Sequence, residues 1–476
     1  MATYRTPGVY VEEINVFPPS VVPVETAIPA FVGYTEKVPT GYDATDPKAF
    51  LINSLSEYEA MFGTTTAESF TFKVKIDATT GVADISQTAQ PDASAVTFHN
   101  LYYSLQHYFA NGGGKCYIVS VGLMSSGNVV PSALALGVDA VAPYDEPTLI
   151  VVPESGLLAD ADYKTVLTKI FNQVGDKKDR FGIVDVNLGY KAKAIDVNAQ
   201  IKKFRDDNTG VNNLKYVAAY FPWFVTTMNF IVSDKSIKFT ADSDTPFKSK
   251  TFDDLSGAAG TPKIRDAYPT VYNNILNLLR QQRVLLPPSP AMAGLYCFVD
   301  RTRGVWKAPA NVSVSNVVSP TFKIDNNMND GMNMDVTGGK SINAIREFPG
   351  KGLLVWGART LAGNDNEWRY VPVRRLFNMM EESIQKALGT FVFEPNDANT
   401  WVKVKAMIEN FLSNLWRDGA LMGAKPEDAF KVQVGFPVTM TQDDILNGYM
   451  NVYVAVAPVR PAEFIVLKFS QKMLQS

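Results

Sequence analysis

The chain has 476 residues, of which 46% are hydrophobic and 20% are charged, and its formal net charge is -3. That length leaves room for about two to four domains with cores of their own. The near-neutral charge lacks the basic footprint of a nucleic-acid-binding protein, two cysteines exclude a disulfide framework, and no apolar run approaches the roughly 20 residues of a membrane-spanning helix.

The first thirty residues predict an extended arm instead of a globular start. Their prolines forbid a helix, and between them lie short strand-prone pieces such as Val9-Tyr10-Val11. The prolines are Pro7, Pro18, Pro19, Pro23 and Pro29. An extended apolar segment of this kind is either disordered or adds a strand to another sheet, and its β-branched and aromatic residues favour the added strand. No apolar run follows a basic cluster here, so we expect no secretory signal and folding in the cytosol.

Residues 31–62 return to a globular pattern, with a strand expected at 31–34. A polar stretch rich in Thr, Ser, Ala and Asp follows at 63–98. Inside it, apolar residues at 70, 72, 74 and 76 alternate with polar ones, which predicts a half-exposed strand in a hairpin closed near Thr80-Gly81. We interpret 63–98 as a surface insertion.

From residue 99 to about residue 335, short apolar runs alternate with helical patterns, which is typical of an α/β layer with a largely parallel sheet. The expected strands are 116–121, 149–152, 181–186, 216–221 and 294–300, and the expected helices are 99–110, 159–174, 194–206 and 268–283. A polar stretch at 233–262 interrupts the series, and we interpret it as a second insertion.

Residues 336–476 have a different pattern, with fewer strands and two amphipathic helices. The helices are expected at 373–388 and 400–417, the strands at 352–356, 430–434 and 451–456. Asp397 or Asn399 can cap the start of the second helix, and Gly419 can end it. The chain then leaves through Pro458 and Pro461 into a second extended, strand-prone arm.

Few residues could support catalysis. The two histidines, His99 and His107, lie eight residues apart in one expected helix. A Ser-His-Asp triad would have to use one of them, and both are better read as ordinary helix residues. Gly112-Gly113-Gly114-Lys115 lies between a helix and a strand, the reverse of a phosphate-binding loop. We therefore expect this segment to end the helix.

Metal and phosphate sites are equally poorly supported. Cys116 and Cys297 lie in apolar runs without a short Cys-x-x-Cys spacing, which indicates small buried hydrophobic residues and not zinc ligands. The clusters Arg301-Thr302-Arg303 and Arg374-Arg375 are best read as solvated faces or structural ion pairs, because the chain carries no overall positive charge.

Several long strings resemble the sheath proteins of contractile phage tails. They are PGVYVEEI at 7–14, PPSV at 18–21, TAIPAFVGYT at 26–35, FANGGGKCYIVSV at 109–121, PPSPAMAGLYCFVDRTRGVWKAPAN at 287–311, INAIREFPGKGLLVWGARTL at 342–361, EWRYVPVRRLF at 367–377, FVFEPND at 391–397 and VAPVRPAEFIV at 456–466. The match thins at 63–98 and 233–262, the two stretches interpreted as insertions.

The resemblance implies an α/β plus α+β fold in four parts. These are an N-terminal arm at 1–30, an α/β sheath domain at 31–335, a C-terminal α+β sheath core domain at 336–457 and a C-terminal arm at 458–476. In the family the central layer is described as subtilisin-like, and the missing triad predicts that it has no protease activity.

The resemblance also implies a structural role, with no cofactor. Subunits stack in rings around an inner tube, and contraction drives the tube through a target envelope. The arms would add strands to neighbouring subunits. Their residues are Val9, Tyr10, Val11, Glu12, Ile14, Phe464, Ile465, Val466, Leu467 and Phe469. Further partners would be the tube, baseplate and tail-end cap proteins, without nucleic acid or membrane insertion, in a phage tail or released tail-like particle assembled in the bacterial cytoplasm.

Sheaths of this family touch their tube through the C-terminal domain, by charge complementarity. The candidate residues here are Lys403, Lys405, Arg417 and Lys425. An ordinary solvated helix face explains these residues about equally well. Two other readings of the chain stay open: a non-contractile tail or baseplate assembly protein, and a hydrolase on the α/β layer, which the shortage of histidines disfavours.

Overall fold

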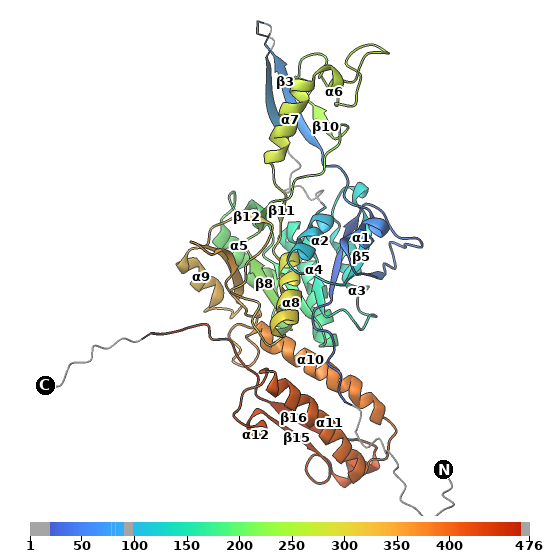
Figure 1. The fold of residues 1–476 in the computed structure, drawn as a ribbon, viewed down its shortest axis with the longest axis vertical. Coiled ribbons are helices and arrows are strands. Elements are labelled where there is room, and N and C mark those ends of the chain that lie inside the picture. Colours follow the sequence, from blue (N-terminus) through green and yellow to red (C-terminus); the bar gives the residue numbers. More distant parts are fainter. Residues whose placement is uncertain (1–19, 78, 81, 90–98, 468–476) are drawn as a thin grey trace, which may run out of the picture. The chain divides into compact units, whose positions relative to one another are not determined.

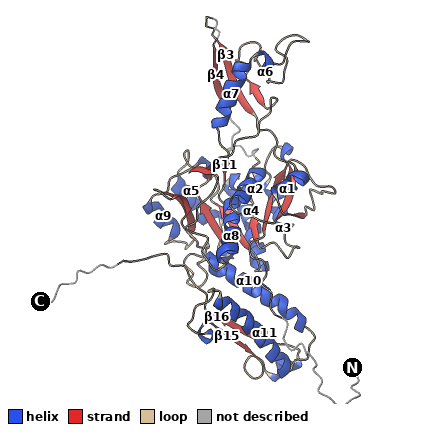
Figure 2. Cartoon of the chain, in the orientation of Figure 1, coloured by secondary structure: helices blue, strands red, loops and turns tan. Residues whose placement is uncertain are grey.

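The computed structural model describes residues 20–77, 79–80, 82–89 and 99–467. The described residues divide into a large unit, within 25–378 and 460–467, and a small unit, residues 20–24 with 379–459. Figure 1 follows the chain through both units, and Figure 2 separates helices from strands.

An eight-stranded sheet forms the centre of the large unit, in the order β14-β13-β8-β7-β6-β1-β5-β2. Its strands are β1 (Pro29–Thr35), β2 (Ala49–Ile52), β5 (Cys116–Leu123), β6 (Leu149–Val151), β7 (Phe181–Asp185), β8 (Val217–Phe221), β13 (Ile342–Phe348) and β14 (Gly352–Val355). The six inner strands pair in parallel, and only β2 and β14 are antiparallel to their neighbours. The predicted largely parallel sheet is confirmed, and it continues past residue 335 into β13 and β14.

Helices cover this sheet and bury apolar side chains against it. They are α1 (Leu55–Phe62), α2 (Leu101–Ala110), α3 (Pro131–Asp139), α4 (Asp160–Lys177), α5 (Val197–Lys203), α8 (Ser289–Arg303) and α9 (Asn326–Asn333). In α4, for example, Val166, Ile170 and Val174 are buried at helical spacing. A second, three-stranded sheet comprises β9 (Phe224–Thr226), β11 (Leu285–Leu286) and β12 (Val317–Pro320).

The strand expected at 294–300 is wrong, because these residues belong to helix α8. Every residue from Ser289 to Cys297 in α8 is buried, so the run has no polar face and its period cannot be read from the sequence. Pro290 is tolerated in the first turn of the helix, and Gly304 follows its last residue with a φ of 90°.

The two expected insertions meet in one small body with its own core. It comprises β3 (Phe70–Ile76), β4 (Ala83–Ala89), β10 (Ile237–Phe239), α6 (Ile264–Ala267) and α7 (Pro269–Gln281). The predicted hairpin is confirmed as the antiparallel pair β3–β4, and β10 pairs in parallel with β3. Helix α7, expected in the central series, instead packs Val271, Ile275 and Leu279 into this second core.

The small unit is built on a long amphipathic helix and a two-stranded sheet. Its elements are residues 379–388 of α10 (Val371–Leu388), α11 (Ala398–Arg417), α12 (Pro426–Ala429), β15 (Phe430–Val434), α13 (Gln442–Leu446) and β16 (Val452–Val456). The Asp397 side chain caps α11 by accepting a hydrogen bond from the Thr400 N–H at 2.9 Å, and Gly419 after the helix has a φ of 83°. Both predicted helix-end residues are confirmed.

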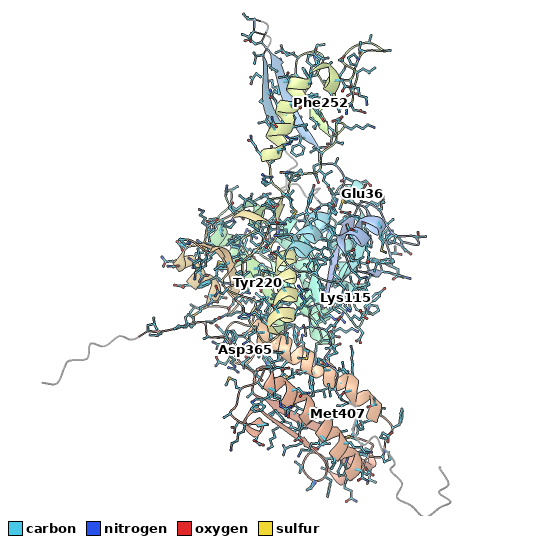
Figure 3. All side chains as sticks on the ribbon, viewed as in Figure 1. Glu36, Lys115, Tyr220, Phe252, Asp365 and Met407 are labelled. Carbon is cyan, nitrogen blue, oxygen red and sulfur yellow. The ribbon has the colours of Figure 1, made fainter. Side chains whose placement is uncertain are left out.

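Figure 3 marks one buried residue in each of the three cores. Tyr220 lies on β8 in the central sheet, Phe252 lies in the insertion body, and Met407 lies on α11. The chain thus places three separately packed bodies along one sequence.

Candidate assembly site

Both histidines are used inside the fold. His99 is 4% exposed and lies 3.5 Å from the buried Glu154 carboxylate, while one of its ring nitrogens lies 3.2 Å from the carbonyl of Gly127. His107 is fully buried, with a ring nitrogen 3.0 Å from the Ser315 carbonyl, and burial lowers its pKa to about 4. Neither histidine has a serine or cysteine nucleophile within hydrogen-bonding distance among the described contacts. His107 is the helix residue that was expected, whereas His99 lies two residues before the first residue of α2, so its placement in the helix is wrong.

The glycine segment turns the chain from α2 into β5, as expected. Gly112 has a φ of 95°, a conformation that favours glycine, and β5 begins at Cys116. Lys115 forms an ion pair with Glu25 at 2.5 Å. Among the described residues there is no group of three or more His, Cys, Asp or Glu side chains that could hold a metal, and both cysteines are buried and free.

The two arginine clusters have different environments. Arg301 and Arg303 are exposed at the end of α8. Arg375 is buried and makes a two-point ion pair with Asp300, at 2.5 and 2.9 Å. Arg374 is also buried, 4.2 Å from the centre of the Trp368 ring. Arg375 thus forms a structural ion pair inside the large unit, as expected for this cluster, while Arg374 packs against aromatic rings and donates a hydrogen bond to the Asn378 side chain.

The two-stranded sheet of the small unit has unpaired outer edges among the described residues. The Ala457 N–H donates to the Ala429 carbonyl at 2.8 Å, so Ala457 faces the β15 side of the pair. Because neighbouring residues in a strand direct their backbone groups to opposite sides, Val452, Val454 and Val456 direct theirs to the outer edge of β16. This edge is a template for a further strand.

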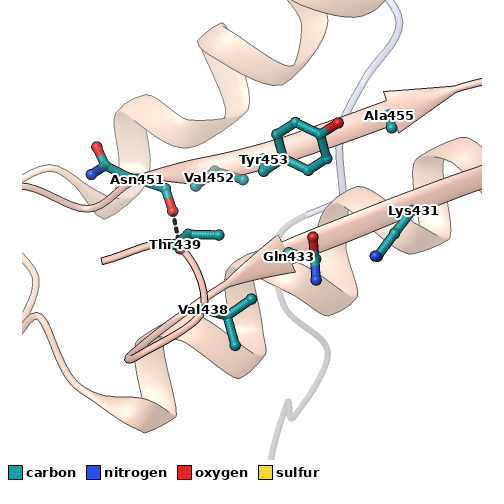
Figure 4. A pocket seen from close by; sticks show the side chains of 8 residues that line it. All are labelled: Lys431, Gln433, Val438, Thr439, Asn451, Val452, Tyr453 and Ala455. Atoms are coloured by element: carbon teal, nitrogen blue, oxygen red, sulfur yellow. Dashed lines mark hydrogen bonds between the residues drawn. The ribbon is translucent and has the colours of Figure 1, made fainter. Parts of the chain in front are cut away.

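One face of this sheet is also open (Figure 4). Helix α11 packs against β15 on the other face, where Val432 is buried. The open face is hollowed, and its floor includes Lys431, Gln433 and the half-exposed Tyr453. The Thr439 hydroxyl donates to the Asn451 carbonyl at 2.6 Å and fixes the loop at the rim. A strand added at the edge would extend a sheet whose geometry is already fixed.

The C-terminal arm is exposed where the structure describes it. Phe464, Ile465, Val466 and Leu467 have between 69% and 79% of their surface accessible. Just before them, Glu463 accepts hydrogen bonds from Arg359. Phe469 and the whole N-terminal set, Val9, Tyr10, Val11, Glu12 and Ile14, lie outside the described residues, so their role stays a prediction.

The four candidate tube-contact residues are all exposed in the small unit. Lys403, Lys405 and Arg417 lie on α11, and Lys425 lies just before α12. Lys405 is 3.7 Å from Glu409 one turn along. The exposure fits both a tube contact and an ordinary solvated face.

Sequence reasoning missed the anchoring of the arm and the free edge of β16. The string VRPAEFIV contained Glu463, but its partner Arg359 lies 104 residues earlier, and no local pattern joins them. The strand β16 itself was expected, although its edge could not be distinguished without the register.

No described helix combines the length and apolar character needed to cross a membrane.

The family model of the phage tail sheath C-terminal domain matches residues 363–472. The tail sheath protein of Vibrio phage KVP40 is 25% identical over 188 residues, which are 39% of this chain and 26% of that protein. The tail sheath protein of Burkholderia phage BcepMu is 30% identical over 183 residues, 36% of this chain and 37% of that protein. The matched regions thus span only about a quarter and a little over a third of these two relatives.

Solved structures are similar over nearly the whole chain. The PVC sheath of an extracellular contractile injection system, in its contracted state, is 30% identical with a TM-score of 0.65, covering 99% of both chains. The helical sheath of the anti-feeding prophage in its contracted state is 29% identical with a TM-score of 0.64, covering 99% of this chain and 100% of that one. A chain in the baseplate structure of the anti-feeding prophage is 30% identical with a TM-score of 0.63, covering 99% and 100%.

Proposed function

This chain belongs to the family of contractile tail sheath proteins, and from that premise we propose that it polymerises around an inner tube and contracts to drive the tube through a target envelope. The supporting observation is that one chain has both an open strand edge, on β16, and an exposed strand-prone arm. A surface and its complement on the same molecule generate open helical assemblies when the contact does not close into a ring.

The proposed joint is strand addition at β16. The arms, Val9–Ile14 at one end and Phe464–Phe469 at the other, would lie along free edges of neighbouring small-unit sheets. Backbone hydrogen bonds supply the strength of such a joint, and alternating side chains fix its register. The exposed Phe464, Ile465, Val466 and Leu467 would then become covered, because isolated exposure of four consecutive apolar residues is unfavourable.

Contraction in this proposal is a change between two packings of the same subunits. The arms stay joined while the rigid bodies rotate, and added contacts in the second packing supply the energy, so no nucleotide or other cofactor takes part. The partners are other copies, the inner tube, the baseplate and a tail-end cap. The chain would act as a structural subunit and not as an enzyme, with its α/β layer subtilisin-like only in fold, inside a particle assembled in bacterial cytoplasm.

The first test is Val454→Pro on the outer edge of β16. Proline removes the outward N–H that an added strand needs, and no bond between β15 and β16 is lost. Val454→Ala is the matched control, because it removes the same side-chain packing and keeps the N–H. Negative-stain electron microscopy should show long hollow tubes for the wild type and Val454→Ala, and only short or no tubes for Val454→Pro.

A chain lacking residues 1–16 tests the N-terminal arm in the same assay, and we expect it to lose tubes as well. Equal tubes from all variants would contradict strand addition. Discrete small particles from the wild type itself would contradict the sheath function and favour a baseplate component or a hydrolase.

A further inference from the structure

The C-terminal arm leaves the protein from a buried ion pair. The Arg359 guanidinium donates to both carboxylate oxygens of Glu463, with Nε–Oε1 at 2.9 Å and Nη2–Oε2 at 2.5 Å. The side chains are 3% and 17% exposed, respectively. The Tyr370 hydroxyl lies 3.4 Å from the same carboxylate. A two-point, largely buried arginine–carboxylate pair has a defined direction and is only weakly screened by salt.

Arg359 is itself held by the central sheet. Its backbone N–H donates to the Asn343 side chain at 2.8 Å, and the Asn343 amide donates back to the Arg359 carbonyl at 2.8 Å. The same amide lies 3.1 Å from the Ala219 carbonyl on β8. Asn343 therefore links Glu463, through Arg359, to two adjacent strands of the large sheet.

The chain around Glu463 has few other attachments. Val459 N–H bonds to the Ala420 carbonyl in the small unit, and Arg460 bonds to the Asn366 carbonyl at 3.0 Å in the large unit. Directly after Glu463 the exposed run Phe464–Leu467 begins. Without the ion pair, residues 460–463 would be held by Arg460 alone or not at all, and fully freed they add about 14 Å of slack to the arm.

We propose that Glu463 is a positioning residue, the root clamp that fixes where the C-terminal arm starts and through which a pull on the arm passes to the large sheet. This inference rests on the proposed function for the arm and adds the device that positions it. A clamped root keeps the arm at high effective concentration near the neighbouring edge, whereas a slack root disperses it over a larger volume.

The test is Glu463→Gln, which removes the charge and keeps the shape. Glu367→Gln is the control, because it removes the same charge from an exposed residue that directly follows Asn366, whose carbonyl accepts from Arg460. A nitroxide on Ile465→Cys reports motion at the root of the arm, and the native cysteines are buried and do not compete for the label. Thermal melting verifies folding, and if Glu463→Gln unfolds, Glu463→Asp takes its place.

We expect a restricted nitroxide spectrum in the unassembled wild type and in Glu367→Gln, and a mobile one in Glu463→Gln. The protein concentration needed for tubes should rise about tenfold in Glu463→Gln and stay within about twofold of wild type in Glu367→Gln. A mobile label in the wild type, or unchanged assembly of Glu463→Gln, would overturn the proposal. If neither the wild type nor any variant forms tubes, but the nitroxide is restricted in the wild type and mobile in Glu463→Gln, the proposed sheath function is wrong and the positioning role of Glu463 is still supported.

Discussion

Asp185 is a carboxyl group that is almost completely buried, at the end of β7 in the large unit. It accepts hydrogen bonds from the N–H of Ser289 at 2.7 Å and from its hydroxyl at 2.6 Å, at the start of α8. Burial raises its pKa to about 7, and the Ser289 bonds only partly oppose this effect. The folded protein therefore holds a proton on Asp185 that the unfolded chain releases near pH 4.

This difference predicts a pH dependence of stability. A raised folded-state pKa gives a stabilising contribution that is complete below the unfolded pKa and is lost as the pH rises through about 7. Asp185→Asn keeps the shape and cannot ionise. Between pH 5.5 and pH 8.5 the free energy of unfolding should change by about 2 kcal/mol in favour of the variant. Thermal or urea unfolding of both proteins at the two pH values measures it, and a pH-independent difference would show an ordinary Asp185 pKa.

At the scale of elements, α8 and α2 pack closely because Gly294 lacks a side chain. A Cβ atom at Gly294 would lie 2.5 Å from the Tyr108 carbonyl oxygen and 3.1 Å from the Asn111 Cβ. Most residues of both helices are buried, so shifting either helix to make room for the added Cβ would disturb close packing and cost free energy.

Gly294→Ala should therefore lower the free energy of unfolding by about 1–3 kcal/mol. Gly331→Ala in α9 is the opposite control: its added Cβ would meet no atom within 4 Å, and removing a helix glycine should stabilise by about 0.5–1 kcal/mol. The melting temperatures of the two variants should move in opposite directions. Equal shifts would mean that α2 and α8 can separate at no cost.

Elements with a one-sided apolar pattern and the short buried strands of the central sheet, such as β7 and β8, were readable from the sequence, whereas the long buried helix α8 was not. Strand β15 was expected with its observed ends, and α11 within about two residues, because each buries one face. Helix α8 was mistaken for a strand because its buried run hides the period. Strand β13 was missed because Asn343, Arg346 and Glu347 interrupt its apolar pattern. The Asn343 side chain nevertheless lies inside the fold, where it forms hydrogen bonds with backbone groups of Ala219 and Arg359.

At the scale of the whole molecule, long-range pairing limits what sequence can predict. The two polar stretches were identified, but their union in one body depends on β3 pairing with β10 about 165 residues later. The arm residues were recognisable as strand-prone, whereas the clamp at Glu463 depends on Arg359, 104 residues away. Local patterns carry neither relation, because both arise only when the sheet of the large unit and its insertion have formed.

In the assembled particle, we expect the sheath to contact the inner tube through exposed lysines of the small unit. Lys403 and Lys405 lie exposed on α11, and the Lys405–Glu409 pair, with both side chains more than 40% exposed, contributes little on its own. A weak, polar, salt-sensitive contact suits a joint that must release the tube during contraction. The double change Lys403→Glu with Lys405→Glu should therefore give sheath tubes without a filled lumen.

Co-expression with the tube protein and negative-stain microscopy measure the fraction of filled particles. Lys248→Glu, an exposed lysine in the insertion body, is the control and should leave particles filled. Raising the salt concentration should empty wild-type particles in the same way, because it screens exposed charges. Filled particles from the double variant would show that the tube contact lies elsewhere and that these lysines belong to an ordinary solvated face.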